Sequence, residues 1–290
     1  MWQLLLQAVV NGVLLGGIYA VYAAGFSLIF GVMKVINVAH GEFVMLGAFV
    51  TYWLFALGHV DPFLAVPVAM AVLFGLGYLL QRLLINRVLS APPLMSLLLT
   101  FGISLIIANS ASAAWTTDFR MITTSYAGSN FAVGGVVFPI ARLVTFSIAL
   151  LVVVLLYVFL QRTEAGRAIR ATAQDRDMAR LMGVDSRRIF ALTFAVGAAI
   201  TGMAGALVTA YFPVFPNMGG TYTMFAFCVV VLGGMGYVPG ALWGGLALGI
   251  IQSLSGTFLS AGISFVITFL VLYGMLVIRP TGLTGRGLLE

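Results

Sequence analysis

Apolar runs of about twenty residues, the length of helix that spans a hydrocarbon core of about 30 Å, fill nearly the whole chain. They are apolar on every side, as at 148–160, whereas membrane β-barrel strands alternate apolar and polar residues over about 10 positions. The pattern therefore predicts an all-α polytopic membrane protein. About eight transmembrane segments are expected, near 4–32, 42–58, 62–81, 94–115, 138–160, 189–211, 222–256 with a break, and 261–278.

Composition excludes a soluble protein. Hydrophobic residues make up 62% of the 290 residues and charged residues 8%, whereas a soluble domain carries about 25% charged residues. We therefore expect a single transmembrane domain over residues 1–290. The one cysteine, Cys228, excludes a disulfide within the chain.

The distribution of lysine and arginine predicts the orientation. Seven of the fourteen lie at 162–188, and alternating the predicted segments places twelve on the side of that loop, against Arg120 and Arg142 on the other. Basic residues collect in short cytoplasmic loops. The loop at 162–188 and the C-terminus are therefore expected to be cytoplasmic. The N-terminus is expected to be external, and a break in the first segment is the alternative that would reverse its side.

Two glycine-rich breaks interrupt the apolar pattern, at 31–47 and 233–245, about 200 residues apart, which suggests a weak internal repeat. Non-helical backbone at membrane depth persists only where protein or a water-filled cavity satisfies it, and paired breaks in two halves of a transporter indicate its pathway. An alternative is that Lys34 and Glu42 simply mark a short cytoplasmic turn. The predicted translocation-path residues are Asn37, His40, Glu42, Gly233, Gly234 and Gly236.

The segment 162–188 holds eleven of the 22 charges. Its spacing predicts one amphipathic helix from Glu164 to Met182, ended by Gly183. The helix would place Ala165, Ala168, Ile169, Thr172, Ala179 and Met182 on one side and Arg167, Arg170, Gln174 and Asp177 on another. One interpretation is that this helix binds anionic lipid. The favoured interpretation is that it docks to a cytoplasmic partner.

Three motifs in the same order resemble the permease subunits of branched-chain amino-acid ABC importers. They are Ile36-Asn-Val-Ala-His-Gly-Glu42 followed by Met45-Leu-Gly47, Gly166-Arg-Ala-Ile-Arg-Ala-Thr-Ala-Gln-Asp175 with Ala179-Arg-Leu-Met-Gly183, and Val231-Leu-Gly-Gly-Met-Gly236 with Pro239-Gly240. The importer pattern Glu-Ala-Ala-x-x-x-Gly keeps only Ala179 and Gly183 here.

The resemblance implies an inner-membrane protein of a bacterium that imports branched-chain or related hydrophobic amino acids by alternating access. Its partners would be a second permease, two cytoplasmic ATP-binding subunits that use ATP and Mg, and an external substrate-binding protein. The charged loop would then couple the chain to the ATPases. The coupling residues would be Gly166, Arg167, Arg170, Gln174, Asp175, Asp177, Ala179 and Gly183.

The chain lacks the residues for chemistry of its own. Its only lysine, Lys34, lies outside any phosphate-binding loop, and its only histidines, His40 and His59, lie on opposite sides of a predicted span. No catalytic residue, metal, bound cofactor or nucleic-acid partner is expected.

The main alternative is a self-sufficient secondary transporter or channel for a small polar solute, although only Glu42 offers a carboxylate near a span. Within the resembled family, urea, amides or aromatic acids are alternative substrates.

Overall fold

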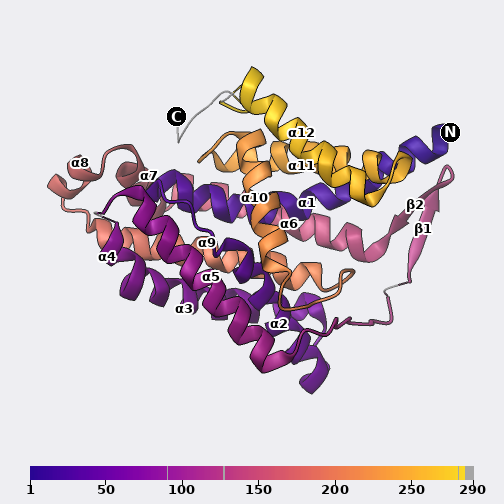
Figure 1. Cartoon of the computed structure of the whole chain (residues 1–290), viewed down its shortest axis with the longest axis horizontal. Coiled ribbons are helices and arrows are strands. Elements are labelled where there is room, and N and C mark those ends of the chain that lie inside the picture. The colour runs from indigo at the N-terminus through magenta and orange to yellow at the C-terminus, as the bar shows by residue number, and fades with distance from the viewer. Residues whose placement is uncertain (90, 127, 280, 285–290) are drawn as a thin grey trace.

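The computed structural model describes the chain except residues 90, 127, 280 and 285–290. Within these described residues, seven helices are long and apolar enough to cross a membrane, and two shorter apolar helices accompany them. The prediction of an all-α polytopic membrane protein is therefore confirmed. The N-terminus and a small hairpin lie at one end of the helix bundle and α7 and α8 at the other, which we call the α7–α8 end (Figure 1).

The helices follow the predicted apolar runs closely. They are α1 (Trp2–Met33), α2 (His40–Gly58), α3 (Pro62–Leu80), the π-helical turn η1 (Gln81–Ile85), α4 (Asn86–Val88), α5 (Pro93–Trp115), α6 (Ile140–Arg162), α7 (Glu164–Gln174), α8 (Arg176–Leu181), α9 (Ser186–Val208), α10 (Gly219–Gly233), α11 (Val238–Phe258) and α12 (Ala261–Ile278).

Helices α1 and α9 form the centre of the bundle and are mostly buried. Glycine allows their neighbours to approach closely. A Cβ atom at Gly12 of α1 would lie 2.6 Å from the Cα of Ile250 in α11, and one at Gly16 would lie 2.7 Å from the Cα of Leu246. Small residues are the usual means of close helix packing in membranes, because lipid provides no hydrophobic drive between helices.

The structure corrects two expectations about the polar segments. The single helix expected from Glu164 to Met182 is two helices, because Asp175 has an extended backbone (φ −149°) and its side chain accepts hydrogen bonds from Asp177 N and Met178 N to begin a new helix. The predicted loop before α6 also contains a hairpin of β1 (Asn130–Val133) and β2 (Val136–Pro139), in which Asn130 pairs with Pro139 and Val133 with Val136.

Asp61 attaches the loop after α5 to the start of α3. Its Oδ1 accepts from Phe63 N at 2.8 Å as the N-cap of α3, and its Oδ2 accepts from the Tyr126 hydroxyl at 2.7 Å. Burial, with the neighbouring carboxylate of Asp61, raises the pKa of Tyr126, so the phenol stays protonated and able to donate at neutral pH.

Removing this carboxylate should destabilise the protein. Asp61→Ala loses both bonds and should lower the free energy of unfolding by about 2 kcal/mol, whereas Tyr126→Phe loses one and should cost about 1 kcal/mol. Thermal unfolding of the purified chain in detergent measures both. Equal stability of Asp61→Ala and the unaltered chain would contradict the assignment.

Candidate translocation path and coupling segment

The first break places its polar residues inside the protein rather than at an open surface. Helix α1 ends at Lys34, which adopts a left-handed conformation (φ 56°), and α2 begins at His40. Asn37, His40 and Glu42 are all buried. The side chain of Asn37 accepts from Ala39 N at 3.1 Å and so stabilises the non-helical turn.

His40 joins α2 to α1. Its Nε2 lies 2.8 Å from the carbonyl oxygen of Tyr22, and since a carbonyl can only accept, Nε2 carries the proton and donates it. The hydroxyl of Thr201 in α9 lies 3.3 Å from the same nitrogen, and the ring of Phe26 meets the imidazole edge-on at 5.1 Å. His40 therefore holds three elements together at the break.

Glu42 connects α2 with α5 and α10. Its Oε1 accepts from the Ser104 hydroxyl of α5 at 3.1 Å, while Oε2 is buried and has no hydrogen-bond partner among the described residues. Gly219, the first residue of α10, lies so close that a Cβ there would overlap the carboxylate. Next to it, Gly41 N donates to the Thr223 hydroxyl at 2.8 Å. Ser104 and Thr223 are site residues that could not be identified in the sequence, since each is a single polar residue in an apolar run.

The second break lies between α10 and α11 and touches the first. Gly234 and Gly236 have φ of 108° and 83°, which residues with a Cβ rarely adopt, so glycine is required at both. A Cβ at Gly31, near the end of α1, would lie 2.8 Å from the carbonyl oxygen of Gly236. The structure thus brings together the two breaks, which lie about 200 residues apart in sequence.

A tyrosine cluster lies along the helices that meet at the breaks. Tyr19 and Tyr22 of α1 have ring centroids 5.6 Å apart, Tyr222 of α10 meets Tyr22 edge-on at 5.8 Å, and the Tyr19 hydroxyl bonds to Gln252 of α11. The hydroxyl of Tyr22 is buried without a hydrogen-bond partner in the described structure. Sequence reasoning did not select these tyrosines, because aromatic residues are common in apolar helices.

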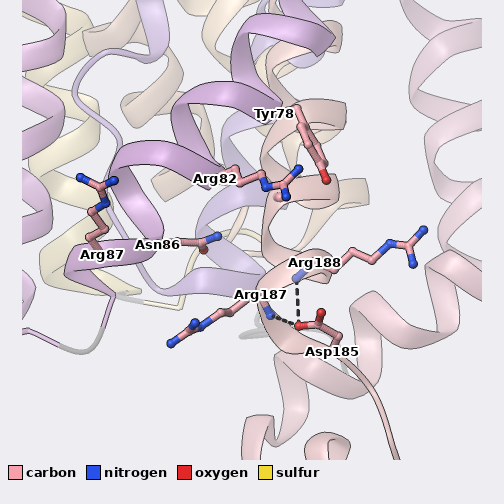
Figure 2. Close-up of a pocket in the computed structure, with 8 residues that line it drawn as sticks. Tyr78, Arg82, Asn86, Arg87, Asp185, Arg187 and Arg188 are labelled. Carbon is pink, nitrogen blue, oxygen red and sulfur yellow. Dashed lines mark hydrogen bonds between the residues drawn. The ribbon is translucent and has the colours of Figure 1, made fainter.

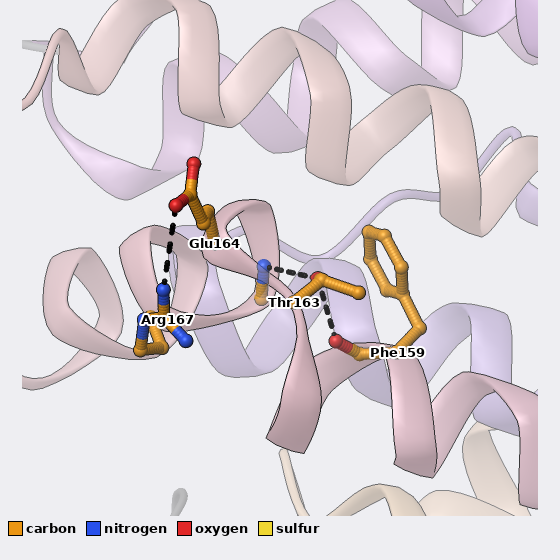
Figure 3. A network of polar contacts seen from close by, with 5 residues as sticks. Phe159, Thr163, Glu164 and Arg167 are labelled. Carbon is orange, nitrogen blue, oxygen red and sulfur yellow. Dashed lines mark hydrogen bonds and ion pairs between the residues drawn. The ribbon is translucent and has the colours of Figure 1, made fainter.

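Helix α7 is joined to the end of α6 by a compact turn (Figure 3). Thr163 donates to the carbonyl of Phe159 at 2.7 Å and accepts from Gly166 N at 3.0 Å as the N-cap of α7. Gly166 is buried where a Cβ would overlap carbonyl oxygens of α6, and Arg170 donates to the carbonyl of Leu160. Arg167 is exposed and pairs with Glu164 at 3.7 Å. The turn fixes the direction in which α7 leaves the bundle.

Helix α8 buries one residue and exposes its larger apolar side chains. Ala179 is buried, whereas Met178, Leu181 and Met182 are 60%, 78% and 85% exposed. Met182, expected on the same side of one helix as Ala179, is exposed although Ala179 is buried, because α8 ends at Leu181 and Met182 lies just beyond it. Gly183 has φ 86° just after the helix and ends it as predicted.

Charged side chains surround these apolar residues. Asp177 lies 3.9 Å from Arg180 in an exposed pair, and Arg176 lies over the ring of Phe190 at 5.0 Å. Desolvation, together with nearby Arg180, lowers the pKa of Arg176 from its usual high value. The combination of exposed methionine and leucine with charges is typical of a protein-binding surface.

A cavity of about 200 Å³ connects the coupling segment with the second break. Arg170 and Gln174 of α7 line one side and Tyr237, Val238 and Pro239 line the other. Helix α7 and the start of α11, which follows Gly234 and Gly236, thus border the same cavity.

At the opposite end of the bundle, Arg120 ties together two loops. Its backbone N donates to the carbonyl of Val214 at 2.9 Å, and Val214 N donates back at 2.7 Å. The guanidinium carbon lies 5.7 Å from the ring centroids of both Tyr52 and Trp53 of α2. The Arg120–Val214 bridge therefore joins the segments before and after it to each other and to α2.

The described part of the chain contains no group of three or more His, Cys, Asp or Glu residues placed to hold a metal ion.

Comparison with known proteins identifies relatives along the whole chain. Residues 8–279 match the family described as the permease component of the branched-chain amino acid transport system. The permease LivH of the high-affinity branched-chain amino acid transport system of Escherichia coli K12 is 33% identical over 97% of this chain and 96% of its own length. The corresponding permease BraD of Pseudomonas aeruginosa is 34% identical over the same shares. A probable branched-chain amino acid permease of Methanocaldococcus jannaschii is 28% identical over 95% of the chain and 91% of its own length. No solved structure matches the chain significantly.

Proposed function

The chain belongs to the permease family of branched-chain amino acid transport systems, and we propose that it forms half of the membrane channel of an ABC importer for branched-chain or related hydrophobic amino acids. ATP would be hydrolysed with Mg by two separate cytoplasmic subunits. An external binding protein would deliver the substrate, and the membrane would be the inner membrane of a bacterium.

One observation carries this proposal: the cavity at which α7 faces the second break. In a transporter that is powered by separate ATPase subunits, the motion of those subunits must reach the pathway through the permease itself. Here Arg170 and Gln174 stand across the cavity from Tyr237, Val238 and Pro239, and the preceding residue, Gly236, lies against Gly31 of the first break. We expect a shift of α7–α8 to move residues 237–239 beside the second break and, through Gly236 and Gly31, the first break as well. Alternating access requires such a coupled movement.

The proposed pathway lies beside the two breaks. Asn37, His40 and Glu42 supply polar groups there, and Gly233, Gly234 and Gly236 supply backbone without side chains. Since Glu42 meets both α5 and α10, movement of either helix would expose or bury its carboxylate.

The proposed orientation has the α7–α8 end and the C-terminus in the cytoplasm and the N-terminus outside. The surface formed by the joined loops at 116–129 and 212–218 would receive the binding protein. The second permease would pack on the face of α5 and α10, which lie on the same side of the bundle (Figure 1). On α5, Asn109 and Ser110 are exposed within the last two turns of the helix, where lipid would be a poor neighbour for polar groups.

Co-purification from the native membrane, followed by reconstitution in liposomes, tests the proposed function. We expect a second permease and two ATP-binding subunits to accompany the tagged chain, and uptake of leucine, isoleucine or valine to require ATP and the binding protein. Uptake by the chain alone, without ATP, would instead establish the alternative of a secondary transporter or channel.

Glu42 offers a test of the pathway residues. Glu42→Gln keeps the shape but replaces the buried carboxyl group between α5 and α10 with an amide, which should reduce the rate of ATP-dependent uptake about tenfold, equivalent to about 1.4 kcal/mol. Ser104→Ala should have a smaller effect in the same direction. The matched control is Ser147→Ala, which removes an exposed serine that bonds only within its own helix. Unchanged uptake by Glu42→Gln at equal protein levels would exclude the residue from the pathway.

A further inference from the structure

A second cavity, of about 820 Å³, opens at the α7–α8 end where α3 continues into η1 and α4 beside the first turns of α9. Figure 2 shows Tyr78 and Arg82 directed from the α3 side toward α9. Arg188 and Arg187 extend from the start of α9 in opposite directions, the latter toward the side of Asn86 and Arg87. Asp185, Arg187 and Arg188 come from the end of the charged segment 162–188, but none of the lining residues is among the predicted path or coupling residues.

The cavity is strongly basic. Four arginines line it, Arg82, Arg87, Arg187 and Arg188, against the single carboxylate of Asp185. That carboxylate already accepts hydrogen bonds from Arg187 N at 3.0 Å and Arg188 N at 3.3 Å as the N-cap of α9. In the described part of the chain none of the four guanidinium groups forms an ion pair. The cavity is thus bordered by more positive than negative side chains, so an anion that reaches two of these arginines would be stabilised.

Neutral groups complete the lining. Gln81 is fully buried and donates to Asn86 Oδ1 at 3.1 Å, which positions the Asn86 side chain beside the cavity. The start of α9, a helix of 23 residues, adds the positive end of its dipole on the side where Arg187 and Arg188 emerge.

The residues around the cavity indicate which kind of anion it binds. The side chains next to Arg82 are apolar and face outward, since Leu79 and Leu83 are each about half exposed on a helix that is long and apolar enough to span the membrane. Tyr78, half-buried one turn before Arg82, is the type of residue found where hydrocarbon meets the headgroups. A free anion would use only the arginines, whereas a phospholipid would use the arginines for its phosphate and α3 for its acyl chains.

We propose that this cavity binds the headgroup of an anionic phospholipid, with the arginines on its phosphate and the acyl chains along the exposed side of α3. The lipid would fill the space between the α3–α4 extension and α9, and so would hold these two elements at a constant separation. The proposal stands independently of the transported solute.

Native mass spectrometry of the purified chain, titrated with phosphatidylglycerol or with phosphatidylcholine of the same acyl chains, tests the proposal. Phosphatidylglycerol should bind more tightly. In the double variant Arg82→Gln/Arg188→Gln its affinity should fall about 30-fold, at roughly a fivefold loss for each arginine near the headgroup plane. The matched control, Arg162→Gln/Arg279→Gln, removes two exposed arginines at the ends of α6 and α12, away from the cavity, and should bind as the unaltered chain does.

Arg82→Lys/Arg188→Lys keeps the charges and should retain most of the affinity for phosphatidylglycerol. If the glutamine variant fails to fold, this lysine variant provides the test. Equal binding of the two lipids, or an equal loss in the control variant, would overturn the proposal. Tight binding of inorganic phosphate that displaces the lipid would show a free-anion site instead. Loss of ATP-binding subunits from the double variant with unchanged lipid affinity would show a protein-docking site instead.

Discussion

Replacing Met178, Leu181 and Met182 together with serine should release the ATP-binding subunits and abolish ATP-dependent uptake, while the chain itself stays folded. The three side chains are mostly exposed, so they contribute little to the core of this chain. Burying each against a partner would stabilise the complex by about 1.5 kcal/mol or more, and losing all three weakens binding about a thousandfold.

Retention of the ATP-binding subunits on the tagged chain measures this effect. Leu57→Ser is a suitable control, because Leu57 is 80% exposed in the last turn of α2, remote from α8. If α8 instead lies on anionic lipid, the triple serine variant will retain its ATP-binding subunits, and its isolated chain will bind phosphatidylglycerol vesicles more weakly. That outcome would contradict docking through α8.

Gly233→Ala should unfold or misassemble the protein, although it adds only one methyl group. Gly233 ends α10, and a Cβ there would overlap the carbonyl of Gly240 in α11, while Gly244, one turn further along α11, packs against Val229 and Gly233. Both neighbours are backbone atoms, which cannot rotate away as a side chain can. Helices α10 and α11 would have to separate, at a cost of about 3 kcal/mol or more.

Gly220→Ala in the same helix provides the matched comparison, because a Cβ at Gly220 would meet no heavy atom within 4 Å. That variant should be as stable as the unaltered chain or slightly more so, since alanine favours helix by about 1 kcal/mol over glycine. Size-exclusion chromatography and thermal unfolding in detergent distinguish the two. Equal stability of both variants would mean that α10 and α11 are not packed as described.

The coupling segment shows where sequence periodicity reaches its limit. The charged character of 162–188 is visible in the sequence itself. The helix end at Gly183 could be predicted because a glycine stops a helix through its own backbone conformation, without distant contacts. The division at Asp175 could not, since an aspartate inside a helix and one that caps a new helix look alike in a periodic pattern. Which side chains of α8 face outward was likewise decided by the structure, which buries Ala179 and exposes Met178, Leu181 and Met182.

The candidate path shows a similar division. Both breaks were visible as glycine with polar residues inside apolar runs, and the family was identifiable from the same motifs. Ser104 and Thr223 were not identifiable, because a single hydroxyl in a membrane helix usually bonds within its own helix. Only their positions opposite Glu42 and Gly41 make them part of the site.

The number and length of the membrane helices, their breaks, the basic loop and the family follow from the sequence alone, because each depends on local composition against the fixed thickness of a bilayer. Contacts between distant segments were decided only by the tertiary structure: Gly31 on Gly236, α7 beside the second break, and four arginines from two helices around one cavity. The reason is physical. Because lipid is as apolar as the helix faces, hydrophobicity in the sequence does not show which faces pack together. Shape and close backbone approach determine which helices meet.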